Sequence, residues 1–146
     1  MFVFKLQSVL EHRKTREEMA LCEFSDATVK LNADRMTMTA LTEKEALLVA
    51  QWRELARRPA RAPDFSLYAE YIKRIQRSLR DQSAIIIAAE EVVERKRVAL
   101  LAIVKERKIL ETLKEKQRQA YESWIAGRER KTMDEIAILK FKWEES

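Results

Sequence analysis

Side chains able to bind a metal or to act as a nucleophile are scarce in this 146-residue chain. It holds one histidine, His12, and one cysteine, Cys22. A zinc site needs several His or Cys ligands, and a Ser-His-Asp arrangement needs a well-placed histidine. His12 lies in a charged stretch, and nothing near Cys22 in the sequence marks its thiol as activated. We therefore expect no metal site, no intrachain disulfide and no catalytic triad.

Paired acidic residues are the remaining candidates for acid–base chemistry. Carboxyl groups act as catalytic acids or bases where a pocket shifts their pKa, and a chain of long helices offers little to do so. The pairs in this sequence are Glu17/Glu18, Glu90/Glu91 and Glu144/Glu145. The single glycine, Gly127, is too few for a loop that binds phosphate through its backbone amides. These observations predict a protein that is not an enzyme and needs no cofactor.

The chain is basic, with 29 Lys and Arg against 24 Asp and Glu and a net charge of +5. The two signs are interleaved rather than gathered in a block, which is typical of a solvated helical surface. All the excess lies in residues 58–146, because residues 1–57 hold equal numbers of each sign. We expect no nucleic-acid partner, and a helical hairpin that binds RNA or DNA is the less favoured alternative.

One short segment interrupts an otherwise helical sequence. Residues 57–63, RRPARAP, contain both prolines, and proline disrupts helices that nearly every other residue here favours. The sequence predicts an all-α fold in which two long helices form an antiparallel coiled-coil hairpin, as a single domain over residues 1–146. Helix 1 is expected at about 4–57, the turn at 58–64 and helix 2 at about 65–143, with Asp64 capping helix 2.

Apolar residues recur in both halves with the seven-residue repeat of a coiled coil. Alternating steps of four and three from Leu6 to Leu55 meet mostly apolar residues, and so does the same walk from Tyr68 to Arg128. The second stripe is strongest before Leu110. A sustained repeat of this kind predicts that each stripe residue packs into a hole on the facing helix.

The C-terminal segment, residues 121–146, is expected to lack a partner within the chain. If the helices pair from the hairpin onward, Leu6 lies near residue 117 and everything beyond overhangs. The segment is nevertheless rich in large apolar residues: Trp124, Ile125, Met133, Ile136, Ile138, Leu139, Phe141 and Trp143. Exposed apolar surface of this extent marks a binding site. The alternative is that the segment bends at Gly127 and folds back onto Phe2, Phe4 and Leu6.

Both ends of the chain carry motifs of a known family. The opening residues MFVFKLQSVLEHRKTREE, Met1 to Glu18, resemble the start of the flagellar type III export protein FliJ family. The segment RKTMDEIA, Arg130 to Ala137, is similar to the Lys-x-Met/Leu-Asp-Glu-Ile/Phe-Ala signature near that family's C-terminus. Together with the length and the two-helix layout, the resemblance spans the chain.

This resemblance implies a soluble, stalk-like coiled coil without enzymatic activity. It implies three partners: the hexameric flagellar export ATPase, which such proteins bind and activate, the cytoplasmic domain of the export-gate membrane protein, and substrate-specific export chaperones. The implied location is cytoplasmic, with peripheral docking at the membrane through the export apparatus. The injectisome counterpart and a general coiled-coil scaffold or chaperone are the alternatives.

The resemblance also implies two contact surfaces. The end of the molecule that holds both termini would enter the ATPase ring, through an ATPase-contact set of Leu6, Leu10, Trp124, Met133, Asp134, Ile136 and Ala137. A surface near the hairpin would meet the export gate, through a gate-contact set of Leu41, Glu45, Leu48, Trp52, Tyr71, Ile75, Ser78 and Gln82. Because these hairpin positions lie on or beside the apolar stripe, the alternative that they only form the core stays open.

Overall fold

Two long helices make up the computed structural model, which describes residues 1–58 and 62–145. Helix α1 spans Gln7–Arg57 and helix α2 spans Ala62–Glu145, and the described residues contain no strand. The predicted all-α class with two long helices is therefore confirmed. The chain divides into two compact units, each holding part of both helices. Unit 1 comprises residues 1–18 and 102–146, and unit 2 comprises residues 19–101.

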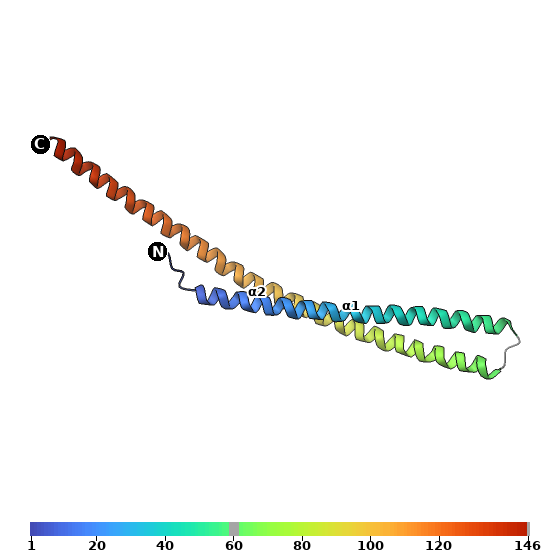
Figure 1. Ribbon diagram of the computed structural model, residues 1–146. Coiled ribbons are helices and arrows are strands. Elements are labelled where there is room, and N and C mark those ends of the chain that lie inside the picture. Colours follow the sequence, from blue (N-terminus) through green and yellow to red (C-terminus); the bar gives the residue numbers. More distant parts are fainter. Residues whose placement is uncertain (59–61, 146) are drawn as a thin grey trace. The chain divides into compact units, whose positions relative to one another are not determined.

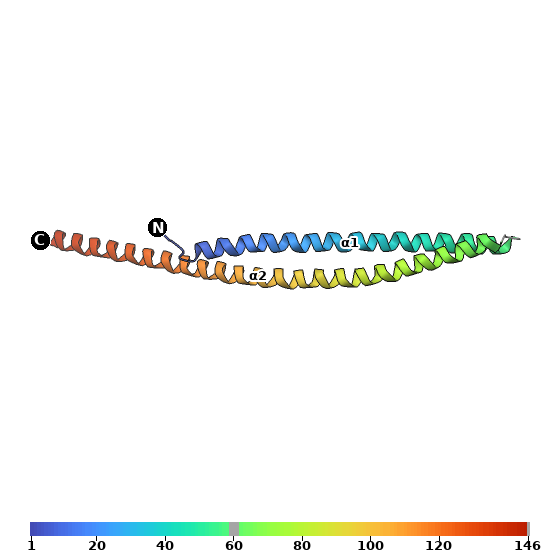
Figure 2. The same cartoon turned by 90° about the horizontal axis from the view of Figure 1, so that it is seen from below.

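Unit 2 is an antiparallel pair of helices (Figures 1 and 2). Trp52 stacks on Phe65 with ring centroids 4.8 Å apart, and the Lys96 ammonium lies 3.1 Å from the Glu23 carboxylate. The later residue of α1 thus contacts the earlier residue of α2, and the earlier residue of α1 contacts the later one, which is antiparallel order. The buried apolar side chains lie on the predicted stripes: Ala20, Leu31, Ile72, Ile75 and Ala89.

Polar residues on the two stripes of unit 2 meet each other. The side-chain amide of Gln82 donates a hydrogen bond to the backbone carbonyl of Asp34 at 2.9 Å, and Gln82 is buried. Arg35 and Glu90 form an ion pair nearby at 3.4 Å. The Asp34 carbonyl supplies the partner that the buried Gln82 amide needs. The Arg35–Glu90 pair forms only where these two side chains lie opposite each other, so it favours this register of the coiled coil.

Unit 1 pairs the start of the chain with residues 102–125 of α2, also in antiparallel order. Arg13 lies 3.0 Å from Glu106, and Tyr121 contacts residues 1 and 2. Helix α1 begins at Gln7, later than the predicted position near residue 4. The physical reason is that the non-helical start of the chain buries Phe4 and places the Phe2 ring beside Tyr121 of α2.

Helix α2 begins at Ala62, earlier than the prediction of residue 65. Pro63 and Asp64 lie within its first turn, where proline costs little because the first amides of a helix have no intrahelical partner. Asp64 is therefore not the cap, but its carboxylate favours the positive end of the helix dipole. Of the predicted turn at 58–64, residues 59–61 lie outside the described part of the chain.

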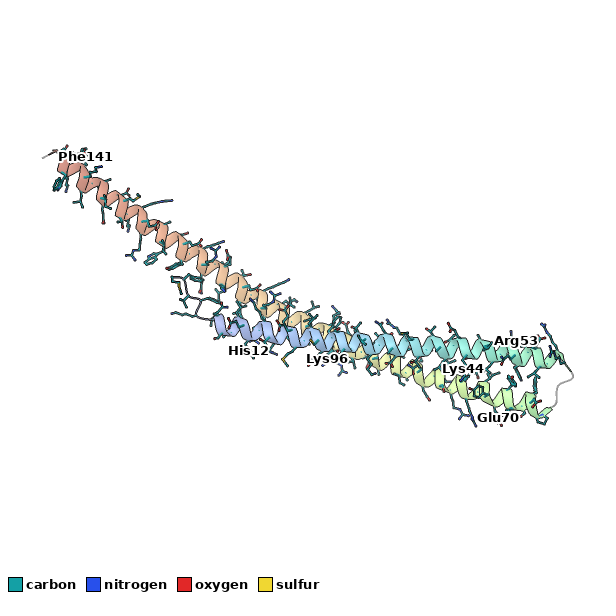
Figure 3. All side chains as sticks on the ribbon, viewed as in Figure 1. His12, Lys44, Arg53, Glu70, Lys96 and Phe141 are labelled. Carbon is teal, nitrogen blue, oxygen red and sulfur yellow. The ribbon has the colours of Figure 1, made fainter. Side chains whose placement is uncertain are left out.

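The last part of α2 continues as a straight extension of the helix within unit 1. Gly127 is helical, and every residue from 126 to 145 is exposed (Figure 3, where Phe141 is labelled). The predicted alternative of a bend at Gly127 with a folded-back segment is wrong. Past Lys114 the half-buried positions are Arg118, Tyr121 and Ile125, so the repeat shifts by one residue from the predicted Gln117 and Trp124.

Truncating a buried stripe residue is expected to destabilise unit 2 far more than truncating an outer one. Leu31 is 6% exposed and Val29 is 64% exposed on the same helix. We expect Leu31→Ala to lower the free energy of unfolding by about 2–4 kcal/mol, because it removes buried methyl groups and leaves a cavity. Val29→Ala should change it by less than about 0.5 kcal/mol. Urea unfolding followed by circular dichroism measures both, and equal losses would contradict the stripe assignment.

Neither helix, over its described residues, contains a stretch long and apolar enough to cross a membrane.

Candidate functional site

The ATPase-contact set lies entirely in unit 1, but its members differ in exposure. Leu10 is only 1% exposed and belongs to the core, whereas Leu6 is partly exposed at the start of the chain. The members on α2 are all exposed: Trp124, Met133, Asp134, Ile136 and Ala137. Leu10 is therefore not available to a partner, and α2 supplies most of the side chains that a partner would touch.

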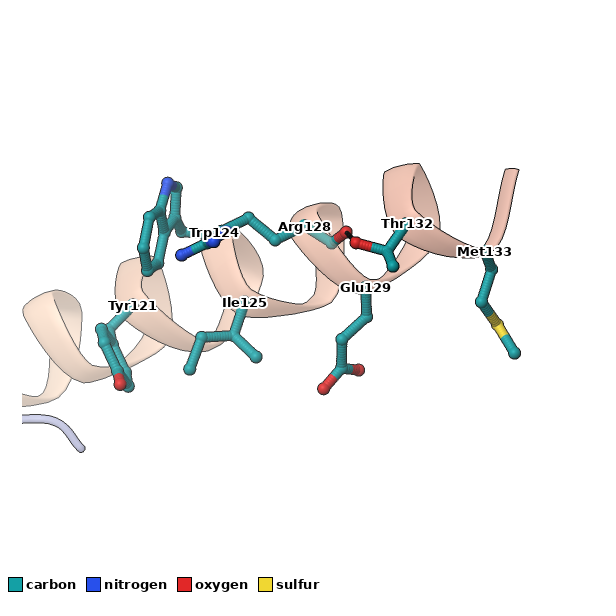
Figure 4. A pocket seen from close by; sticks show the side chains of 7 residues that line it. All are labelled: Tyr121, Trp124, Ile125, Arg128, Glu129, Thr132 and Met133. Atoms are coloured by element: carbon teal, nitrogen blue, oxygen red, sulfur yellow. Dashed lines mark hydrogen bonds between the residues drawn. The ribbon is translucent and has the colours of Figure 1, made fainter. Parts of the chain in front are cut away.

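A shallow groove runs along α2 between two rows of side chains (Figure 4). In each row the residues are four positions apart. One row consists of Trp124, Arg128 and Thr132, and the other consists of Tyr121, Ile125, Glu129 and Met133. Rows of residues four apart form ridges on a helix surface, and the groove between two ridges accepts the ridge of another helix. The Arg128 guanidinium lies 5.0 Å from the Trp124 ring centroid, which gives the groove a cationic edge beside an aromatic face.

The start of the chain closes one end of this groove. The N-terminal ammonium of Met1 donates a hydrogen bond to the Tyr121 hydroxyl at 2.7 Å, and the Phe2 ring lies 5.8 Å from the Tyr121 ring. The Tyr121 and Trp124 rings are 6.2 Å apart. Residues from both ends of the sequence thus build one aromatic cluster, next to the exposed part of α2.

An ionic network joins the two helices at the other end of unit 1, near Glu17 and Arg107. Arg107 donates hydrogen bonds to Glu17 on α1 and, at 2.8 Å, to Glu111 on α2. Both Arg107 and Glu17 are half-buried stripe residues. The hydrogen bonds to Glu17 and then to Glu111 raise the pKa of the Arg107 guanidinium, so it stays charged. A charged pair at stripe positions has its partner in only one register, which fixes how far α2 extends past α1.

Reversing the charge of Glu17 is expected to loosen this end of unit 1. Glu17→Arg places two guanidinium groups together, so amide hydrogen exchange over residues 7–18 should accelerate by at least about tenfold. Adding Arg107→Glu restores opposite charges and should recover most of the protection. Exchange measured by mass spectrometry tests this double-mutant cycle, and simple addition of the two effects would show that the pair does not hold the register.

The gate-contact set lies entirely in unit 2 and falls into two groups. Ile75 and Gln82 are buried between the helices, and the side-chain amide of Gln82 donates a hydrogen bond to the backbone carbonyl of Asp34. The remaining members are half-buried or exposed: Leu41, Glu45, Leu48, Trp52, Tyr71 and Ser78. For Ile75 and Gln82, the core alternative left open by the sequence therefore describes their position in this structure.

An aromatic groove includes two of the accessible members of this set, Leu48 and Tyr71. It is lined by Leu48 of α1 and by Leu67, Tyr68 and Tyr71 of α2. The Lys44 ammonium lies 5.2 Å from the centroid of the Tyr71 ring, so the groove is apolar with a cation at its edge. Such a combination suits a partner segment that presents apolar side chains beside a carboxylate.

The residues singled out for possible chemistry are not brought together. His12 and Cys22 are both exposed, with His12 on the outer side of α1 (Figure 3). Among residues 1–58 and 62–145 there is no group of three or more His, Cys, Asp or Glu side chains that could hold a metal ion.

Several groove residues were missing from the sequence-based sets. They are Tyr121, Ile125, Arg128, Glu129 and Thr132 in unit 1, and Lys44, Leu67 and Tyr68 in unit 2. The spacing held a signal for some of them, because residues three or four apart are neighbours on a helix surface. Leu67 lies four residues before Tyr71, and Tyr121 and Arg128 lie three residues before and four after Trp124. The Lys44 ammonium over the Tyr71 ring joins α1 to α2, so this contact depends on the helix alignment and on rotamers.

Comparison with known proteins gives one match. The model of a family described as Flagellar FliJ protein matches residues 1–146, the full length of the chain. No curated protein and no solved structure matches the chain.

Proposed function

The chain belongs to the flagellar FliJ family, and from this premise we propose that it is a stalk-like, non-enzymatic activator of the flagellar export ATPase. Membership of the family supports a role in flagellar protein export. The observation that carries the finer proposal is the exposed apolar surface of α2 over residues 126–145, which includes Met133, Ile136 and Leu139. Surface of this kind is stabilised by burial against another protein.

The proposed mechanism uses binding energy rather than chemistry. A single helix with apolar side chains on several sides can occupy the centre of a ring and contact several subunits. A ligand that binds the assembled ring but not the free subunits shifts the equilibrium toward the ring by mass action. ATP turnover then rises because more subunits are assembled, and the activator needs no catalytic residue.

The direct test is ATP turnover by the purified export ATPase with and without this chain. Turnover per subunit is expected to rise most at subunit concentrations where the ring is only partly assembled. An unrelated two-helix coiled coil of similar net charge serves as the control. Unchanged turnover over the whole concentration range would contradict the proposal.

We propose in addition that the aromatic groove of unit 2 binds the cytoplasmic domain of the export-gate protein, and that the protein handles export chaperones. Its location would be cytoplasmic, with peripheral docking at the membrane through the gate. The groove residues Leu48 and Tyr71 support the gate contact because they combine apolar area with accessibility. Loss of swimming in a deletion strain, restored by this gene, would separate a flagellar role from an injectisome or general scaffold role.

A further inference from the structure

One face of α2 carries a further row of side chains near its end, which is apolar apart from Thr132 and which we call the apolar row. Thr132, Ile136, Leu139 and Trp143 are spaced by four, three and four residues, so they share one face of the helix. This apolar row continues the half-buried positions Tyr121 and Ile125 of unit 1. Ile136 is 58% exposed and Leu139 is 61% exposed. The row has the pattern of a coiled-coil stripe that α1 does not cover.

The surface between these side chains has the form that a facing helix requires. A hollow is lined by Ile136, Leu139, Lys140 and Trp143. These are positions i, i+3, i+4 and i+7, the four residues that make a hole for one side chain of a facing helix. The expected occupant is therefore another helix with an apolar stripe.

We propose that the occupant is the apolar row of a second copy of this chain, lying antiparallel. The spacing of four, three and four reads the same in both directions, so a reversed copy meets the row in register. Ile136 then lies opposite the second copy's Leu139, and the small Thr132 lies opposite the large Trp143. Pairing of small with large side chains fills the space between helices without voids.

The charges of the same segment favour the reversed arrangement. Residues 126–145 hold five basic and five acidic side chains, arranged in blocks that alternate in sign. The first block, residues 128–131, is basic except for Glu129. It is followed by the acidic pair Asp134 and Glu135, the basic pair Lys140 and Lys142, and the acidic pair Glu144 and Glu145. Reversal about a point beside Ala137 brings each block opposite one of the other sign, whereas a parallel copy brings like charges together.

This self-association has a consequence for the proposed function, although it does not depend on it. The reversed pair covers Ile136 and the neighbouring Met133 and Ala137, which belong to the ATPase-contact set. The dimer and the complex with the ATPase ring would therefore exclude each other. Free protein would keep its apolar surface covered until the ring displaces the second copy.

The oligomeric state of the purified full chain, with no ATPase present, tests the proposal. Sedimentation equilibrium is expected to show a monomer–dimer equilibrium over about 5 to 500 µM. Ile136→Asp should raise the dimer dissociation constant by at least about tenfold, because it places a carboxylate in the apolar interface. Ile138→Asp is the matched control, since Ile138 is 57% exposed on a different face of the same helix and should leave the constant unchanged.

The orientation is tested with a spin label at Ala126→Cys in a Cys22→Ser background. In the antiparallel pair the two labels are separated by about 23 residues of helix, or roughly 35 Å along the axis. In a parallel pair they lie within about 20 Å of each other.

A monomer at every concentration, an equal effect of the two aspartate variants, or a short label distance would each overturn the proposal. Because the assay contains no ATPase, failure here leaves the ATPase activation to be decided by its own turnover measurement.

Discussion

Deletion of residues 126–146 is expected to abolish stimulation of the export ATPase while leaving the coiled coil as stable as before. Every residue from 126 to 145 is exposed, so the deletion removes little packing from the buried residues of unit 1, Phe4 and Leu10. The free energy of unfolding should change by less than about 0.5 kcal/mol. Turnover above the basal rate should fall by at least about tenfold, because the apolar side chains that bind the ring are gone.

A point variant with a matched control separates this effect from a general loss of apolar surface. Met133 is 72% exposed near the end of α2, and Met36 is 73% exposed on α1 in unit 2. Met133→Asp should weaken stimulation, because a charge at a buried interface position must be desolvated. Met36→Asp should leave it unchanged. Stimulation that survives the deletion, or that is lost equally in both variants, would place the ATPase contact elsewhere on the chain.

Much of this architecture was predictable because coiled coils are encoded by simple periodic patterns. The walk from Leu6 through Leu10 and Leu31 to Leu55 follows positions that are buried or half-buried in the structure, apart from the first. The two prolines predicted the position of the break between the helices to within a few residues. The starts of the helices were less predictable, because Phe4 gains more from packing outside the helix than from extending it.

The pairing of polar residues across the helices was not predictable from one-dimensional periodicity. The walks identified Glu17, Asp34, Gln82 and Arg107 only as interruptions of the apolar stripes. In the structure Gln82 reaches the backbone of Asp34, and Arg107 pairs with Glu17. Such pairs depend on which residues lie opposite each other, and that depends on the length of the connection. The resulting polar layers specify the alignment at some cost in apolar burial.

The members of the two candidate contact surfaces were likewise only partly predictable from the sequence. A family resemblance carries residue positions but no information on burial, so it assigned Leu10 and Ile75 to contact surfaces although both are core residues here. The shift of the repeat after Lys114 moved Ile125 to the covered side of α2 and left Trp124 exposed. A single-residue shift of this kind follows from three-dimensional packing, because the sequence pattern weakens where charged residues occupy the stripe.

Tyr71 and Ile75 are expected to show opposite effects on gate binding and stability. Ile75 is 5% exposed, so Ile75→Ala should lower the free energy of unfolding by about 2–4 kcal/mol through the cavity that it leaves. Tyr71 is 38% exposed and lines the aromatic groove, so Tyr71→Ala should cost less than about 1 kcal/mol. Affinity for the gate's cytoplasmic domain should instead fall by at least about tenfold, because partly exposed aromatic residues commonly dominate interfaces.

Calorimetric titration of the gate domain at a temperature where both variants are folded separates binding from folding. Ser78→Ala is the control, since Ser78 is an exposed member of the gate-contact set outside the groove. A large loss of affinity for Ile75→Ala with native stability would mean that the helices separate on binding and present the buried stripe to the gate. Unchanged affinity for Tyr71→Ala would remove the aromatic groove from the gate contact. The expected pattern, weak binding by a stable Tyr71 variant alone, requires that the gate recognises the outer surface of an intact coiled coil.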